Sequence, residues 1–80
     1  SWSIYPNPAS DFIEIKIGND SNNQYAVKLI DVIGRVIIDN TIINTNHLKI
    51  QTSDFSNGLY FIQLEDATSI IDKKQIILQR

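Results

Sequence analysis

His47 is the only histidine in this 80-residue chain, so it is the first residue to weigh for catalysis. A hydrolase of the serine, histidine and acid type needs a histidine that activates a hydroxyl and is itself oriented by an acid. His47 follows Asn46 at the start of an expected strand, and local spacing brings no serine or aspartate to it. We expect an exposed polar residue at this position and no enzymatic activity from the chain.

Carboxylates in expected loops could supply oxygen ligands to a calcium ion. Asp20 with Asp31, or Glu65 with Asp66, are the candidates, but no segment has the spacing of an EF-hand loop. The three glycines stand apart, which excludes a glycine-rich phosphate loop, and there is no cysteine for a disulfide or a zinc site. The sequence therefore predicts solvated loop acids, with no metal and no other cofactor.

Aromatic side chains could form a platform that stacks on sugar rings. The candidates are Trp2, Tyr5, Tyr25, Tyr60 and Phe61. Most of them fall on alternating positions that are expected to face a core, whereas Trp2 lies outside the first clear strand and is expected to pack over an edge of the fold. The pair Lys73-Lys74 is expected to be a solvated stretch that keeps an edge strand from pairing with neighbouring molecules.

Charge and hydropathy exclude several classes of partner. A formal net charge of -2 and a pI near 5.0 provide no field that gathers phosphates, so nucleic acid is not an expected partner. The apolar runs are far shorter than the roughly 20 residues that span a bilayer, and no basic and then apolar leader opens the sequence. Since Ser1-Trp2 reads as the middle of a longer sequence, we expect a larger parent protein, and any leader that it carries would lie upstream.

Apolar and polar side chains alternate along several short segments, which is the period of a half-buried β-strand. In 12–17, for example, three isoleucines at alternate positions fall on one face. The tetrad from Asp31 to Gly34 has the composition of a tight turn that pairs the strands on either side of it. The expected strands are 12–17, 25–30, 35–39, 47–51, 59–64 and 70–78, and 40–46 is either a short edge strand or a crossover.

About seven short strands without a convincing helix are the pattern of an immunoglobulin-like antiparallel β-sandwich. We therefore predict an all-β fold in which residues 1–80 form one domain, since a chain of this length is too short for two cores. A small open barrel has a similar periodicity and stays an alternative topology. Phe55 is expected to be buried within a polar loop, and Gln79-Arg80 to trail away from the last strand.

Four motifs, spread over essentially all of the chain, occur in an order that points to a family. They are Pro6, Asn7 and Pro8 in a double-proline segment, Asp31, Gly34 and Arg35 in a strand-turn-strand segment, Gly58 and Tyr60 in a G-x-Y element, and Lys73, Lys74, Ile76, Ile77 and Leu78 in a basic and apolar tail. The two prolines are expected to hold the incoming chain extended. In this order the motifs resemble the type A C-terminal sorting domain of the type IX (Por) secretion system, which ends many proteins exported by Bacteroidetes.

The resemblance implies that the domain is an address for secretion. A parent protein would cross the inner membrane with an ordinary leader, fold in the periplasm and present this domain to the outer-membrane translocon and its shuttle proteins. The cargo would precede the domain in the same chain and would reach the cell surface or the medium. In this family a sortase-like protease at the cell surface commonly removes the domain, and the cargo is released or joined to anionic lipopolysaccharide.

The resemblance also implies roles for individual residues. Gly58 and Tyr60 would hold the strand geometry, while Lys73, Lys74 and the apolar residues 76–78 would be offered to the export machinery. Strand addition at the last strand would suit this role, because an unpaired edge offers donors and acceptors that do not depend on side chains. In many members the tail lysine lies closer to the end, so either Lys73 or Lys74 could be the recognised one.

Two other functions fit such a domain. One is an immunoglobulin-like accessory module of a secreted enzyme that binds carbohydrate or a surface through Trp2 and Tyr25. The other is a spacer that caps the preceding domain. The apolar face of 59–61 would also allow a weak homodimer. Asn19-Asp20-Ser21 has the pattern of an N-glycosylation acceptor, which in a bacterial protein we expect to be only a loop.

Overall fold

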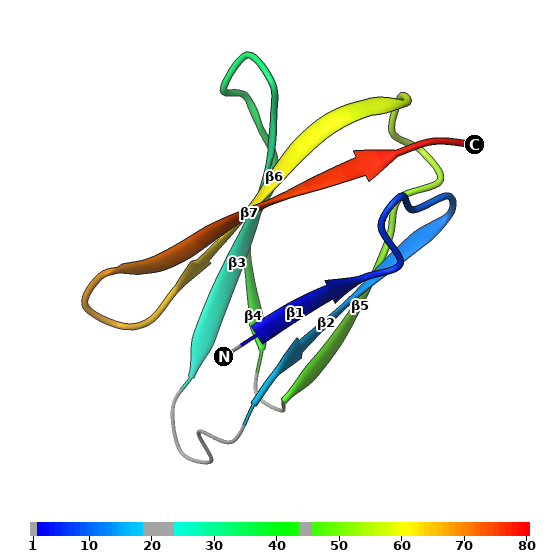
Figure 1. The fold of residues 1–80 in the computed structure, drawn as a ribbon. Helices are drawn as coiled ribbons and strands as arrows, with labels where there is room; N and C mark the ends of the chain where they lie inside the picture. Colours follow the sequence, from blue (N-terminus) through cyan, green and yellow to red (C-terminus); the bar gives the residue numbers. More distant parts are fainter. Residues whose placement is uncertain (1, 19–23, 44–45) are drawn as a thin grey trace.

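Two antiparallel β-sheets pack face to face in the computed structural model, which describes residues 2–18, 24–43 and 46–80 (Figure 1). The isoleucines and valines that dominate the chain favour this structure, because β-branched side chains lose less freedom on a pleated strand than on a helix. None of the described residues belongs to a helix long and apolar enough to cross a membrane. The strands are β1 (Trp2–Tyr5), β2 (Phe12–Ile17), β3 (Tyr25–Asp31), β4 (Val36–Ile43), β5 (His47–Gln51), β6 (Gly58–Glu65) and β7 (Ile70–Leu78).

The strand order confirms the predicted sandwich. One sheet has the order β1-β2-β5 and the other has the order β4-β3-β6-β7, and every pairing is antiparallel. This division of strands between the sheets is an immunoglobulin-like arrangement. Within the described ranges, no strand of one sheet pairs with a strand of the other, so the fold is not the small barrel.

The core lies between the sheets and is built from alternate residues of the strands. The isoleucines of β2 are buried as their alternation predicts, and Phe55 is half-buried against the same core. Removing these apolar side chains from water is the main force that holds the two sheets together. The largest fully buried side chains are Ile13, Ile15, Leu29, Ile62, Ile76, Leu78, Val27 and Thr52.

The first strand, β1, was not predicted, because four residues show too few alternations to reveal a strand. It pairs antiparallel with β2. Since β1 and β2 run in opposite directions, the segment between them reverses the chain, and the expectation that Pro6 and Pro8 hold it extended is wrong. The peptide bonds before both prolines are cis.

The segment 40–46, which the sequence left open, is only partly described. Residues 40–43 complete β4, which is an edge strand of the four-stranded sheet. Residues 44 and 45 lie outside the described residues, and β5 of the three-stranded sheet begins at His47. The described residues thus contain about the predicted number of strands, and β1 takes the place of the separate strand that was considered for 40–46.

Arg80 does not trail away from the fold as predicted. Its Nη1 donates hydrogen bonds to the carbonyl oxygens of Ser10, at 2.7 Å, and Thr52, at 3.2 Å, and its Nη2 donates to the carbonyl oxygen of Phe55. The backbone N–H of Arg80 also donates to Oδ1 of Asn57. Arg80 thus joins the loop between β1 and β2 to the loop between β5 and β6, two loops that lie far apart in the sequence.

Candidate functional site

Strand β7 carries the predicted tail residues and lies at an edge of the four-stranded sheet (Figure 1). Successive side chains of a strand point to opposite faces, so the five residues do not form one surface. Lys74, Ile76 and Leu78 face the inside of the sandwich, and both apolar residues are buried there. Lys73 and Ile77 face outward, where Ile77 is 44% exposed.

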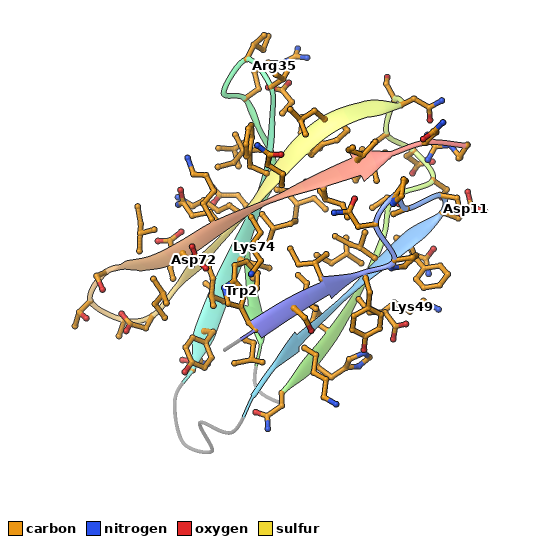
Figure 2. The ribbon with its side chains drawn as sticks, in the orientation of Figure 1. Trp2, Asp11, Arg35, Lys49, Asp72 and Lys74 are labelled. Carbon is orange, nitrogen blue, oxygen red and sulfur yellow. The ribbon has the colours of Figure 1, made fainter. Side chains whose placement is uncertain are left out.

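Lys74 belongs to a cluster that joins the two sheets. The indole Nε1 of Trp2 donates a 2.9 Å hydrogen bond to Oδ2 of Asp72, and Nζ of Lys74 lies 5.3 Å from the centroid of the Trp2 ring. Figure 2 shows these three side chains together between β1 and β7. Trp2 thus packs over an edge of the sandwich, as predicted, and connects β1 to β7 through its contacts with Asp72 and Lys74.

The cluster also changes the acidity of Asp72. The hydrogen bond from Trp2 is the largest cause that lowers the pKa of this carboxyl, followed by the bond from the N–H of Lys73. In the Trp2→Phe variant, which keeps a ring but removes the donor, we expect the pKa of Asp72 to rise toward its ordinary value, as measured by NMR titration of the carboxyl group. Asp66, whose pKa is lowered by the N–H groups of Thr68 and Ser69, is the internal control and should not move. An unchanged Asp72 titration would contradict the assigned contact.

The double-proline segment covers part of the β7 edge. Oδ1 of Asn7 accepts a hydrogen bond from the N–H of Ile77, and Nδ2 of Asn7 donates to the carbonyl oxygen of Gln75. Ala9 continues this pairing, since its N–H donates to the carbonyl oxygen of Ile77 and its own carbonyl oxygen accepts from Gln79. Pro6, Asn7 and Pro8 therefore hold a loop against the end of the last strand.

The loop leaves the middle of the β7 edge open. The N–H and C=O of one residue in an antiparallel strand point to the same side. The backbone N–H and C=O groups of Ile77 and Gln75 point away from β6, so by alternation those of Lys73 also point away from β6. The N–H of Lys73 donates a hydrogen bond to Oδ1 of Asp72. The C=O of Lys73 and the N–H of Gln75 are the groups left for a partner, within the part of the chain that the structure describes.

Among the residues that the structure describes, strand β1 has backbone N–H and C=O groups without a strand partner on the edge that borders a cleft beside β7. The N–H of Ile17 donates to the carbonyl oxygen of Asn46, which turns the backbone groups of Ile17 toward β5. Trp2 lies opposite Ile17 and Ile4 lies opposite Ile15. Because the backbone groups of Ile17 point to β5 and not to β1, those of Trp2 and, by alternation, of Ile4 point away from β2. The cleft, of about 500 Å³, lies between these two strand edges. Its lining residues are Trp2, Ser3, Ile4, Asn7, Lys74 and Gln75.

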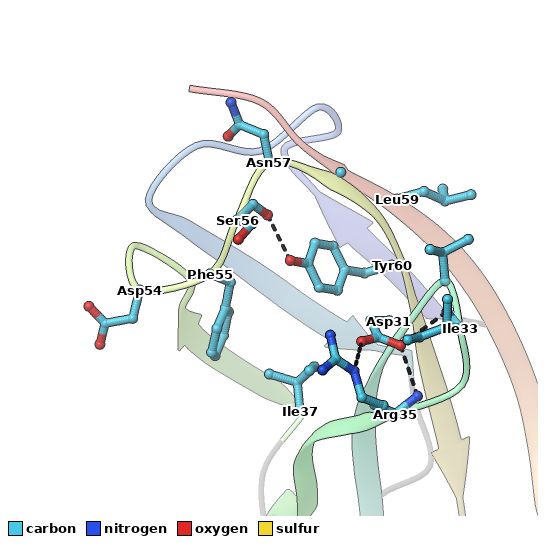
Figure 3. A pocket seen from close by; sticks show the side chains of 12 residues that line it. Asp31, Ile33, Arg35, Ile37, Asp54, Phe55, Ser56, Asn57, Leu59 and Tyr60 are labelled. Carbon is cyan, nitrogen blue, oxygen red and sulfur yellow. Dashed lines mark hydrogen bonds and ion pairs between the residues drawn. The ribbon is translucent and has the colours of Figure 1, made fainter.

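A second group of motif residues meets at one end of the four-stranded sheet (Figure 3). Oδ1 of Asp31 accepts hydrogen bonds from the N–H groups of Ile33 and Arg35, and its Oδ2 accepts a 2.7 Å bond from Nε of Arg35. Gly34 supplies the positive φ of 94° that closes this turn, which most residues resist. The predicted tight turn between β3 and β4 is therefore confirmed.

Tyr60 lies directly opposite Asp31 on the neighbouring strand β6. Its hydroxyl donates a 2.7 Å hydrogen bond to the carbonyl oxygen of Ser56, which fixes the loop before β6. A pocket here holds about 350 Å³, and Asp31, Arg35, Gly58 and Tyr60 all line it. Two motifs that are separated by more than twenty residues in the sequence thus form one structural unit.

Asp31 makes the stability of this unit dependent on pH. Burial raises the pKa of its carboxyl, but the hydrogen bonds and charge of Arg35 and the N–H of Ile33 together hold that pKa below the ordinary value of 3.8. A lowered pKa in the folded state stabilises the fold above the ordinary pKa, and this contribution is lost as the pH falls through the folded pKa. We expect the urea midpoint to be flat above about pH 5 and to fall below about pH 4.

The Asp31→Asn variant is the control for this pH dependence. It should be less stable than the parent at pH 7 and should lose less stability on acidification, because one of the titrating carboxyls is gone. Identical acid profiles for the two proteins would contradict the assignment.

Comparison with known families decides what this fold is used for. A family model described as the secretion system C-terminal sorting domain matches residues 3–78, nearly the whole chain. The chain belongs to this family. A comparison with curated proteins gives no match. The family agrees with the one that the four motifs indicate, so that identification is confirmed.

The sorting domain is the C-terminal signal for type IX secretion in Bacteroidetes. It marks proteins that pass through the outer membrane to the cell surface or the medium. The domain therefore interacts with the type IX secretion machinery and serves a cargo region on its N-terminal side. A signal of this kind is not itself catalytic.

The other candidate residues of the sorting domain take part in local contacts. Nε2 of His47 lies 2.8 Å from Oε1 of Glu14 on an exposed face. Glu65 pairs with Lys28, and Asp66 accepts hydrogen bonds within its own turn. Residues 2–18, 24–43 and 46–80 contain no group of three metal-ligating side chains. Asp20 and the 19–21 glycosylation pattern lie outside the described residues.

The aromatic residues do not form a shared platform. Tyr25 and Tyr60 are buried in the core as predicted, but Tyr5 and Phe61 lie on the outer faces of different sheets, which corrects the expectation that most face inward. Trp2 is occupied by Asp72 and Lys74. The contacts proposed for a carbohydrate-binding module, Trp2 and Tyr25, are thus used within the sorting domain itself.

Proposed function

We propose that the export machinery reads this sorting domain at the open edge of β7 by adding a strand to it. The open C=O of Lys73 and N–H of Gln75, at the margin of the cleft beside β1, support this proposal. Added strands gain affinity from main-chain hydrogen bonds and specificity from neighbouring side chains. Lys73, Lys74 and Ile77 would supply that specificity, while Ile76 and Leu78 would act through the fold.

Reading a folded edge explains how one signal can serve unrelated cargo. The backbone groups of an edge strand are the same whatever protein precedes the domain, and the rigid sandwich holds them at a fixed spacing. Residues 1–80 would then be a single domain at the end of a secreted parent, with the cargo before it. Shuttle proteins would carry it to the translocon, and a sortase-like protease would cut near or upstream of Ser1, so that the cargo is released or attached to lipopolysaccharide.

The sorting function of this chain is tested by transfer. Residues 1–80 are fused to the C-terminus of a periplasmic reporter in a cell with a working type IX system. We expect the reporter in the medium or at the surface, and in the periplasm when the translocon is deleted. A fusion that stays in the periplasm of the competent cell would count against the function.

The strand-addition step is tested separately by a pair of variants at Gln75. Its N–H points away from β6, so Gln75→Pro removes an open donor without removing a hydrogen bond between β6 and β7. Gln75→Ala keeps the N–H and is the matched control. We expect the proline variant to be folded by circular dichroism and exported at least tenfold less than the alanine variant. Equal export of two folded variants would exclude strand addition and leave the sorting function intact.

A further inference from the structure

The outer face of the four-stranded sheet is apolar toward one end. Val36, Ile30 and Phe61 lie opposite one another across three strands, and the pair Leu59 and Ile77 comes next along the sheet. Val36 is 48% exposed and Ile77 is 44% exposed. Single exposed apolar residues are ordinary, but a contiguous group of them marks an interaction site. These five residues are called the apolar face below.

The outer face of the three-stranded sheet has a different character. There Glu14 pairs with His47, and Nζ of Lys49 lies 4.4 Å from the centroid of the Phe12 ring. Lys16 is exposed beside them. Tyr5 is 39% exposed on this face too, but charged side chains lie beside it and the described residues of this face form no contiguous apolar group of the kind on the other sheet. The contrast between the sheets means that the apolar face is not a general property of this small domain.

Lys73 provides the charge that selects a partner for the apolar face. Its Nζ lies 5.8 Å from the centroid of the Phe61 ring, and the described residues place no carboxylate within ion-pair distance of it. The carboxylates on the same face, Asp39 and Glu65, both pair with Lys28. An uncompensated cation therefore stands at the margin of the apolar group, and a carboxylate on a partner would complement it.

This charge pattern argues against a second copy of the chain as the occupant. Two copies that met through this face would bring a second Lys73 and no carboxylate that is free of Lys28. Lys74, by contrast, lies on the inner side of β7 over Trp2 and beside Asp72. Of the two lysines in the tail, Lys73 alone points toward a partner on the outer face.

We propose that the apolar face with Lys73 is a second docking surface, which binds a protein of the type IX machinery through apolar side chains and a carboxylate facing Lys73. This proposal rests on the sorting function, because it seeks the partner in that machinery. Lys73 and Ile77 would also lie beside an added strand, but Val36 is on β4 at the opposite edge of the sheet, so a probe at Val36 separates this surface from strand addition. If the machinery bound both the apolar face and the open edge of β7, the domain would be held in one orientation relative to the machinery.

The role of the Lys73 charge is tested by comparing Lys73 with Lys49. Each of these lysines lies over a phenylalanine ring on the outer face of its own sheet. In the reporter fusion, Lys73→Glu should reduce export at least tenfold and Lys73→Arg should restore it. Lys49→Glu, on the other sheet, should export within twofold of the parent. Equal export of Lys73→Glu and Lys49→Glu would overturn the role of Lys73.

The apolar face is tested by photo-cross-linking, which does not depend on whether a variant lowers stability. A benzophenone amino acid is placed at Val36 or, as the control, at Lys16, in fusions that are still exported. We expect Val36 to cross-link to a translocon or shuttle protein at least fivefold more than Lys16 does. Cross-links only to a second copy, or none to the machinery while export continues, would overturn the docking surface. Loss of export from the unmodified fusion would instead contradict the sorting function.

Discussion

The Ile76→Ala variant should lose about 2–5 kcal/mol of unfolding free energy, the usual effect of truncating a buried isoleucine. Ile76 is 0% exposed, so alanine leaves a cavity that the close-packed sheets fill only in part. The total stability of a domain of this size is only about 4–12 kcal/mol. We therefore expect a large fall in the urea midpoint and a corresponding loss of export.

Ile77→Ala is the matched control for this prediction. Ile77 neighbours Ile76 in the same strand but is 44% exposed, so its truncation should change the free energy of unfolding by less than about 0.5 kcal/mol. If the two variants were equally stable, the alternation of β7 would be assigned incorrectly. If Ile76→Ala were unfolded by circular dichroism and still exported normally, recognition would not require the folded sandwich.

The burial of Ile76 also limits what a deletion can show. A truncation that begins at Lys73 removes Ile76 and Leu78, both of which belong to the core, together with the contacts that hold the double-proline loop. The shortened domain would lose its fold along with its tail. Loss of export would then have two explanations, and point variants on opposite faces of β7 separate them.

Tyr60→Ala is the second variant for which we expect a severe loss, of about 3–5 kcal/mol. Tyr60 is 7% exposed, lies opposite Asp31 on the neighbouring strand and reaches the loop before β6 through its hydroxyl. Tyr60→Phe keeps this packing and removes only the hydroxyl that donates to Ser56, so it should lose about 0.5–1.5 kcal/mol. Chemical denaturation of the three proteins under the same conditions measures both quantities.

The pair of Tyr60 variants separates two explanations of the G-x-Y element. A large loss in alanine and a small one in phenylalanine would mean that the ring holds the fold. Equal losses would instead mean that the hydrogen bond to the loop is the essential contact. Normal export of a stable Tyr60→Phe protein would further show that the hydroxyl is not presented to the machinery.

Much of the fold follows from the alternation of residues. Whether a side chain of β2 or β3 faces the core depends on a period of two that is visible in six or seven residues, and Ile13 and Val27 are buried accordingly. The turn from Asp31 to Gly34 is equally local, since its hydrogen bonds join residues no more than four positions apart. Fold class, this turn and the family motifs were therefore predictable.

The site depends on contacts that local sequence does not contain. Trp2 and Asp72 are 70 positions apart, as are Asn7 and Ile77, and nothing in either neighbourhood indicates its partner. Even Lys73 and Lys74, which are adjacent and chemically identical, acquire different surroundings because β7 happens to lie at a sheet edge beside β1.

Alternation and local motifs are therefore enough to predict a two-sheet domain and the family to which it belongs. Three features become visible only in the folded domain: which strand edge stays open, which lysine lies on the outer face, and how residues 2–9 contact the last strand. The physical reason is that strand faces are set by a repeat along the chain, whereas edges and their neighbours are set by long-range pairing between strands.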